Sequence, residues 1–202
     1  MRRAQLTTAL LAVTSLLLVG CGGGDDSSDG QKPASQEVAG SEEIASTWPL
    51  TGLPVSGDED VAKTYPVLVT KIDNTEASSP QIGLGQADLV VEELVEGGLT
   101  RLAAFYYSQL PSTVGPVRSM RASDIGIVSP VDASVVTSGA AGRTIARIKG
   151  AGIQFFQEGA KGISRDSSRS APYNVFADLT VIAKTTEQDA TRPEDYLPWG
   201  EE

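Results

Sequence analysis

The chain has 202 residues, a formal net charge of −10 and no histidine, which excludes Ser-His-Asp and Cys-His catalysis, histidine-bound zinc and an imidazole general base. Its single cysteine, Cys21, excludes an internal disulfide. Because the sequence has no basic run, we expect no nucleic-acid partner, and no motif points to a bound cofactor.

The first 20 residues have the order of a bacterial secretion signal. Arg2 and Arg3 precede an apolar, uncharged run over residues 9–20, and a small residue stands directly before Cys21. Such a run is too short for a membrane-spanning helix and is typical of a signal peptide that ends at a lipidated cysteine. We therefore expect residues 1–20 to be removed. Acyl chains such as palmitate on Cys21 would then hold the protein on the extracytoplasmic face of the cell membrane.

Residues 21–47 are rich in Gly, Ser, Asp and Glu and contain few large apolar side chains. Such a stretch cannot bury enough surface to offset the entropy lost on ordering, so we expect a disordered tether there. Residues 48–202 are enough for one hydrophobic core, and we expect a single domain.

The folded part alternates β-rich and helical patterns. In the first half we expect an extended strap over 48–54, a strand over 66–72, a turn or single helical turn over 81–87 and paired strands over 88–96 and 99–107. A helix over 119–128, a strand over 134–137, a helix over 142–149 and a strand over 153–157 should follow. The last part should contain a polar loop over 161–174 and a helix or strand-helix mixture over 178–187. This order predicts an α/β or α+β fold with a mixed β-sheet, a Gly-Gly hairpin and flanking helices.

Gly97 and Gly98 are typical of a two-residue hairpin turn. Counting back from that turn gives the pairs Glu96–Leu99, Leu94–Arg101 and Glu92–Ala103. Arg101 then has two glutamates as diagonal neighbours, while Glu93 is the single charge on the opposite, apolar face. A carboxylate and arginine site and a structural ion-pair ladder both fit this pattern, and a slip of one residue would exchange the faces.

Arg118 and Arg121 lie three residues apart at the expected start of the helix over 119–128, with Ser119 or Ser123 as its cap. Two guanidinium groups beside a helix N-terminus would suit a carboxylate or a phosphate. Pairing of the two arginines with the hairpin glutamates inside the fold is the other interpretation.

Two further segments carry polar candidates. The stretch 165–174 includes Arg169 and Asn174 and is either a binding loop or surface filler. Asp73 and Asn74 follow a strand directly, as turn formers or oxygen donors. A divalent-cation site built from Asp73 and the hairpin glutamates has only a weak signal, because no loop has calcium-binding spacing, and we expect no metal.

Several motifs occur in the order found in one family. They are Lys71-Ile72-Asp73-Asn74, Pro80-Gln81 with Gly83-Leu84, Gln86-Ala87-Asp88-Leu89-Val90, Glu93-Leu94-Val95-Glu96-Gly97-Gly98, Thr100-Arg101 and Gly115-Pro116-Val117-Arg118-Ser119 with Arg121. Through them the chain resembles the YerB-like lipoproteins of Gram-positive bacteria, whose N-terminal domain is catalogued as domain of unknown function 3048. The resemblance implies an extracytoplasmic role but no established reaction. Tyr173 stands where the family commonly has a histidine, and the family's second, smaller domain is expected to be missing from a truncated copy.

The expected function is that of a non-enzymatic envelope protein that binds an anionic or polar ligand, a wall fragment or a partner protein. The candidate binding residues are Lys71, Asp73, Asn74, Glu92, Glu93, Glu96, Arg101, Arg118, Arg121, Arg169 and Asn174. The alternative is a carboxylate-dependent hydrolase or transferase acting on wall glycan or peptide, with Glu93 or Glu96 as acid or base.

Overall fold

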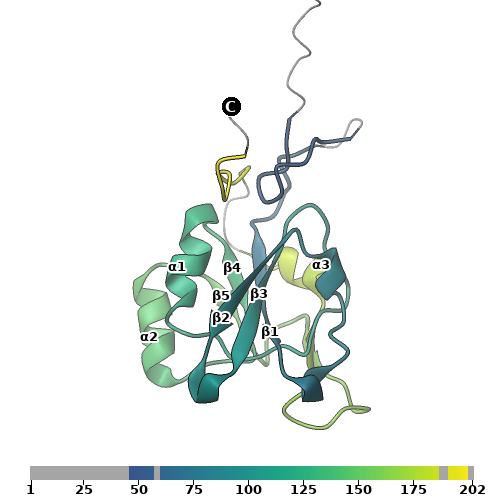
Figure 1. The fold of residues 1–202 in the computed structure, drawn as a ribbon, viewed down its shortest axis with the longest axis vertical. Coiled ribbons are helices and arrows are strands. Elements are labelled where there is room, and N and C mark those ends of the chain that lie inside the picture. The colour runs from purple at the N-terminus through teal and green to yellow at the C-terminus, as the bar shows by residue number, and fades with distance from the viewer. Residues whose placement is uncertain (1–45, 57–59, 187–190, 200–202) are drawn as a thin grey trace, which may run out of the picture. The chain divides into compact units, whose positions relative to one another are not determined.

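The computed structural model describes residues 46–56, 60–186 and 191–199. The expected signal peptide, Cys21 and almost all of the expected tether lie outside these residues. The core of the fold is a five-stranded mixed sheet in the order β2-β3-β1-β4-β5 (Figure 1). Its strands are β1 (Leu68–Asp73), β2 (Leu89–Leu94), β3 (Thr100–Tyr106), β4 (Ser134–Val136) and β5 (Phe155–Phe156).

The sheet is antiparallel on one side of β1 and parallel on the other. Strand β3 pairs antiparallel with both β1 and β2, whereas β4 pairs parallel with β1 and β5 parallel with β4. The helices α1 (Asp124–Val128), α2 (Gly142–Gly150) and α3 (Leu179–Ala183) complete the main body. This mixed sheet with flanking helices confirms the predicted fold class.

Both faces of the sheet are covered. One face buries Val69, Ala103 and Phe105 with residues of α1 and α2, and the other buries Leu68, Ile72 and Ala104 with residues of α3. Figure 1 shows α1 and α2 on one side of the sheet and α3 on the other. Because alternate residues of β1 face opposite sides, Lys71 points toward the layer that contains α1.

The expected register of the hairpin is wrong by one residue. Glu93 lies opposite Arg101, and Leu94 lies opposite Thr100. The strands are joined by residues 95–99 rather than by two residues, because Glu96–Gly98 forms a 3-10 turn in which both glycines have positive φ. The longer connection places Glu93 on the same face of the sheet as Arg101, Lys71 and Asp73.

The helix expected over 119–128 begins only at Asp124. Arg118 and Arg121 therefore precede the helix and are not in its first turn. The segment 116–118 instead runs along the end of β1, where Ile72 and Val117 form an antiparallel bridge. Ser123 makes no capping hydrogen bond, and Ser119 lies outside the helix.

Two other expectations need correction. Residues 48–54 form a tight turn instead of an extended strap, since the backbone N–H groups of Thr51 and Gly52 both donate to Trp48 O. The polar loop expected over 161–174 contains β6 (Ile163–Arg165), which pairs antiparallel with β7 (Val175–Ala177). The other expected strands and helices are present, most of them with shorter bounds; β1 extends one residue further, to Asp73, and α2 ends at Gly150. Helix α3 is capped by Asp178, whose carboxylate accepts from the N–H groups of Thr180 and Val181.

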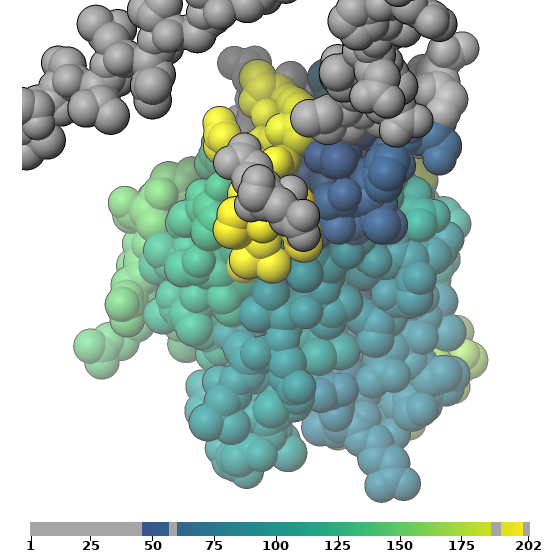
Figure 2. Space-filling view, turned by 45° about the horizontal axis from the view of Figure 1, so that its top comes forward, coloured from purple at the N-terminus to yellow at the C-terminus, as the bar shows by residue number. Residues whose placement is uncertain are grey.

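The two ends of the described chain meet. The N–H of Tyr196 and the indole N–H of Trp199 both donate to Pro49 O, and Arg192 donates to Thr47 O. Figure 2 shows residues 46–56 and 191–199 next to each other on one face of the molecule.

Candidate functional site

The candidate site lies at the carboxyl edge of the parallel part of the sheet. Strands β1, β4 and β5 run in the same direction, so their carboxyl ends meet at one edge, where open α/β sheets commonly bind ligands. The backbone N–H of Arg118 donates to Lys71 O at 2.8 Å, and the N–H of Ser138, just after β4, donates to Arg118 O at 3.1 Å. These bonds fix the backbone of Arg118 between the ends of two strands.

A buried network of charges lies directly behind this edge. Lys71, which is fully buried, forms ion pairs with Glu93 and with Asp124, the latter at 2.8 Å. The hydroxyl of Ser123 donates to the second oxygen of Glu93 at 2.7 Å. Burial raises the pKa of the Asp124 carboxyl, while the neighbouring Lys71 acts to lower it. The network joins β1, β2 and α1 and leaves Glu93 only 7% exposed.

Arg118 is held in place without being saturated. Its Nη1 lies 3.0 Å from Asp73 Oδ2, yet this nitrogen is buried and has no acceptor in hydrogen-bond geometry. The guanidinium carbon lies 5.4 Å from the centre of the Tyr173 ring. A guanidinium carries five N–H donors, so this group retains capacity for an anionic oxygen.

Arg118 lines a pocket of about 190 Å³ at the carboxyl edge. The lining residues are Arg118, Ser119, Ser138, Glu158, Arg165, Ala171, Pro172 and Val175. The hydroxyl oxygens of Ser119 and Ser138 lie 3.4 Å apart within it. This set of residues is hereafter called the Arg118 pocket.

The other two arginines near the hairpin are occupied. Arg101 Nη1 donates to Ser119 O at 2.7 Å, and burial lowers the pKa of Arg101, as do the nearby Arg121 and Arg118. Arg121 forms a two-pronged pair with the exposed Glu96, with Nη2 and Oε2 2.6 Å apart. The Arg121 hydrogen bond lowers the pKa of Glu96 to about 2.

The remaining candidates lie around this cluster. Asn74 donates to Glu92 and to Thr100, which ties the end of β1 to the hairpin. Arg169 donates to the backbone oxygens of Ser78 and Pro80, away from the hairpin glutamates. Asn174 accepts from Arg165 at 2.8 Å. The structure thus brings Lys71, Asp73, Glu93, Arg101, Arg118 and Arg121 together at one end of the sheet.

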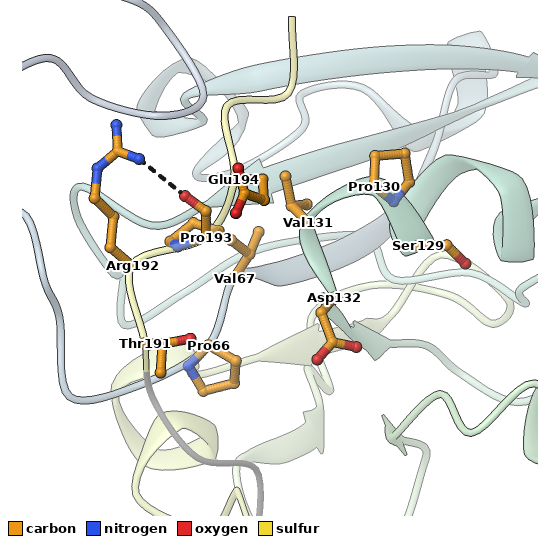
Figure 3. Close-up of a pocket in the computed structure, with 10 residues that line it drawn as sticks. All are labelled: Pro66, Val67, Ser129, Pro130, Val131, Asp132, Thr191, Arg192, Pro193 and Glu194. Carbon is orange, nitrogen blue, oxygen red and sulfur yellow. Dashed lines mark hydrogen bonds between the residues drawn. The ribbon is translucent and has the colours of Figure 1, made fainter.

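A second pocket, of about 310 Å³, lies at the opposite end of β1 (Figure 3). It is lined by Pro66, Val67, Ser129, Pro130, Val131, Asp132, Thr191, Arg192, Pro193 and Glu194. Arg192 lies at its side and already donates to Thr47 O, Pro193 O and Asp195. This pocket offers carboxylates, and its arginine is committed to the protein itself, so it is a poorer anion site than the Arg118 pocket.

The described residues contain neither a candidate metal site nor a candidate membrane-spanning helix. Within 46–56, 60–186 and 191–199, no three acidic or cysteine side chains are placed to hold a metal ion. Asp73, Glu93 and Glu96 are paired with Arg118, Lys71 and Arg121, respectively. Over the same part of the chain, no helix has the length and apolar character needed to cross a membrane.

Residues 50–192 match the family described as "Protein of unknown function (DUF3048) N-terminal domain". The chain belongs to this family. A Bacillus subtilis relative with the printed name "Putative lipoprotein YerB" is 30% identical over 187 residues, which cover 91% of this chain and 52% of the relative. The crystal structure of YerB protein from Bacillus subtilis superposes with a TM-score of 0.67 at 26% identity, over 75% of this chain and 53% of that one. The chain thus spans about half the length of these DUF3048 relatives.

Sequence reasoning missed the roles of four polar residues of this DUF3048 domain. Asp124 and Ser123 belong to the buried network, and Glu158 and Arg165 belong to the pocket. Asp124 gave one usable signal, as the single charge in the apolar stretch 122–131. Arg165 gave a signal as the first residue of the candidate loop over 165–174, whereas Glu158 gave none, because its pairing with Arg165 depends on how the chain folds between them.

Proposed function

We propose that this chain is a lipid-anchored, extracytoplasmic protein of the cell envelope that binds an anionic group of an envelope ligand in the Arg118 pocket. The observation that carries the proposal is the Arg118 guanidinium, which lines the pocket and has the Asp73 carboxylate beside its Nη1 but no acceptor in hydrogen-bond geometry among the described residues. A guanidinium has five N–H donors, so an anionic oxygen of a ligand can accept from those that do not face Asp73.

The surroundings of Arg118 suit an anion better than they suit solvent alone. Asp73 balances the charge and Tyr173 supports the guanidinium plane, so the group is preorganised. Ser119 and Ser138 add two hydroxyl groups, of which one can donate to the other and leave the second as a donor to a ligand. Carboxylate and phosphate are the two anionic groups that match a guanidinium in geometry.

The anchor is supported by the sequence order that ends at Cys21 and by the lipoprotein name of the Bacillus subtilis relative.

Binding is favoured over hydrolysis by the contacts of the two candidate acids, Glu93 and Glu96. Glu93 is held by Lys71 and Ser123, and Glu96 is held by Arg121. A carboxylate that serves as acid or base in glycoside hydrolysis faces its partner carboxylate across an open cleft.

The experiment is a sedimentation assay of the purified full chain, kept in detergent, with Bacillus subtilis wall sacculi. We expect the chain to sediment with sacculi and to be released by excess propionate or phosphate but not by chloride at equal ionic strength. Arg118→Gln should lose sedimentation, whereas the exposed Arg147→Gln, which removes the same charge, should keep it. Sacculi stripped of teichoic acid distinguish a phosphate ligand from a carboxylate ligand, because the peptide carboxylates remain on them and the teichoic-acid phosphates do not. Release by chloride alone, or equal sedimentation of both variants, would overturn the proposal.

A further inference from the structure

The Arg118 pocket contains an acid as well as two arginines, and the roles of the two arginines differ. Arg165 uses Nε and Nη2 on the two oxygens of Glu158, at 2.5 and 2.8 Å, and Nη1 on Asn174 at 2.8 Å. Three of its five N–H donors are therefore used within the protein. Arg118, by contrast, has the Asp73 carboxylate beside its Nη1 and no acceptor in hydrogen-bond geometry among the described residues.

Glu158 retains acceptor capacity despite its pairing with Arg165. An ionised carboxylate offers about four lone-pair sites, and Arg165 occupies one on each oxygen. The Glu158 side chain is 39% exposed, so a ligand can reach the free sites. The pocket thus combines one donor group that needs an anion with one acceptor group that can take a cation.

From this combination we propose that the ligand group bound in the pocket is a small zwitterion of the α-amino acid type, with its carboxylate on Arg118 and its ammonium on Glu158. The inference rests on the proposed function and names its ligand class. A simple anion would bring a second negative charge beside Glu158, and a simple amine would leave Arg118 unsatisfied. A zwitterion satisfies both groups at once.

The volume of the pocket and its apolar residues limit the size and the side chain of the ligand. The volume of about 190 Å³ is below the range of roughly 300–1,000 Å³ found for drug-sized ligands, so the group bound is small. Ala171, Pro172 and Val175 form a wall without charge, which suits a short aliphatic side chain. Alanine is therefore the natural probe.

The test is isothermal titration calorimetry of the purified full chain in detergent with alanine, propionate and ethylamine. Propionate lacks the ammonium and ethylamine lacks the carboxylate, so each probe removes one half of the zwitterion. We expect alanine to bind at least about tenfold more tightly than propionate, as one charged hydrogen bond is worth that factor or more. Ethylamine should bind more weakly than alanine as well.

Variants separate this inference from the proposed function. Glu158→Gln should reduce alanine binding to the level of propionate and leave propionate binding no weaker, whereas Glu76→Gln, an exposed control, should change neither. Equal binding of alanine and propionate to the wild-type chain would overturn the zwitterion while leaving the anion site intact. If propionate and alanine both fail to bind, the anion site itself is overturned.

Discussion

Lys71 Nζ lies 2.8 Å from Asp124 Oδ1, and both side chains are completely buried. The pair links the middle of the sheet to the first residue of α1, and Glu93 makes it a triad. Two carboxylates and one ammonium leave a buried excess of negative charge. This excess agrees with the raised pKa of Asp124, which results first from burial.

Lys71→Met should destabilise the fold by about 3–5 kcal/mol at neutral pH, because it leaves Glu93 and Asp124 buried without their cation. The free energy of unfolding is measured by urea titration. Lys161→Met removes the same charge from an exposed position and should change stability by less than about 0.5 kcal/mol. A loss below about 1 kcal/mol for Lys71→Met would show that the carboxylates do not depend on the lysine.

The ion pair of Glu96 and Arg121 should make the free energy of unfolding depend on pH below about pH 4.5. The pKa of Glu96 is lowered from 4.5 to about 2 in the folded state, so its contribution is complete above pH 4.5 and is lost as the pH falls toward 2. Glu96→Gln should remove this loss from the curve of urea midpoint against pH, and Arg121→Gln should remove the largest part of it, because a backbone hydrogen bond and Arg101 also lower this pKa. Because the pair is exposed, high salt should weaken the effect in the wild-type chain. Identical curves for wild type and Glu96→Gln would contradict the prediction.

Gly83 and Gly97 have the same φ of +75° but different surroundings. An added Cβ at Gly83 would lie 2.5 Å from the backbone oxygen of Thr113, whereas one at Gly97 would meet nothing within 4 Å. Gly97→Ala should therefore lower the free energy of unfolding by about 1–2 kcal/mol, the cost of holding alanine in the left-handed conformation. Gly83→Ala should cost about 1–3 kcal/mol more, because the backbone must move. Equal urea midpoints for the two variants would show that the Thr113 backbone yields freely.

Cys21→Ala should release the chain from the membrane fraction of a Gram-positive host and abolish labelling by radioactive palmitate. The expectation follows from the sequence around Cys21, since durable anchoring needs two acyl chains. Lys161→Met should stay in the membrane fraction and keep its label. Retention of Cys21→Ala at the membrane would mean that another part of the chain provides the attachment.

Most of the fold could be predicted from local patterns. The apolar runs before Asp73 and around Gly97 predicted β1, β2 and β3, and the glycines after residue 149 predicted the end of α2. The hairpin register could not be predicted, because it depends on a 3-10 turn at Glu96–Gly98 that the glycine pair alone does not specify. A shift of one residue was enough to move Glu93 to the face of Lys71.

The candidate site was predicted in part. The motif with Arg118 and Arg121 does meet the hairpin end, since Arg121 pairs with Glu96 and Arg118 with Asp73. The expectation that both arginines stand at a helix N-terminus was wrong, because neither arginine is part of a helix. Arg165 was predicted only as part of a polar loop, since its pairing with Glu158 could not be predicted without the fold that makes its segment the strand β6.

The contacts between the two ends of the described chain have a mechanical consequence. Pro49 and Thr47 are bonded to Trp199, Tyr196 and Arg192, near the start of β1. Six residues of strand, on the order of 20 Å, separate this point from Asp73. With the proposed anchor on Cys21, a pull that reaches the fold from its N-terminal side would act on these bonds first, and the far end of the sheet, where the Arg118 pocket lies, would keep its geometry.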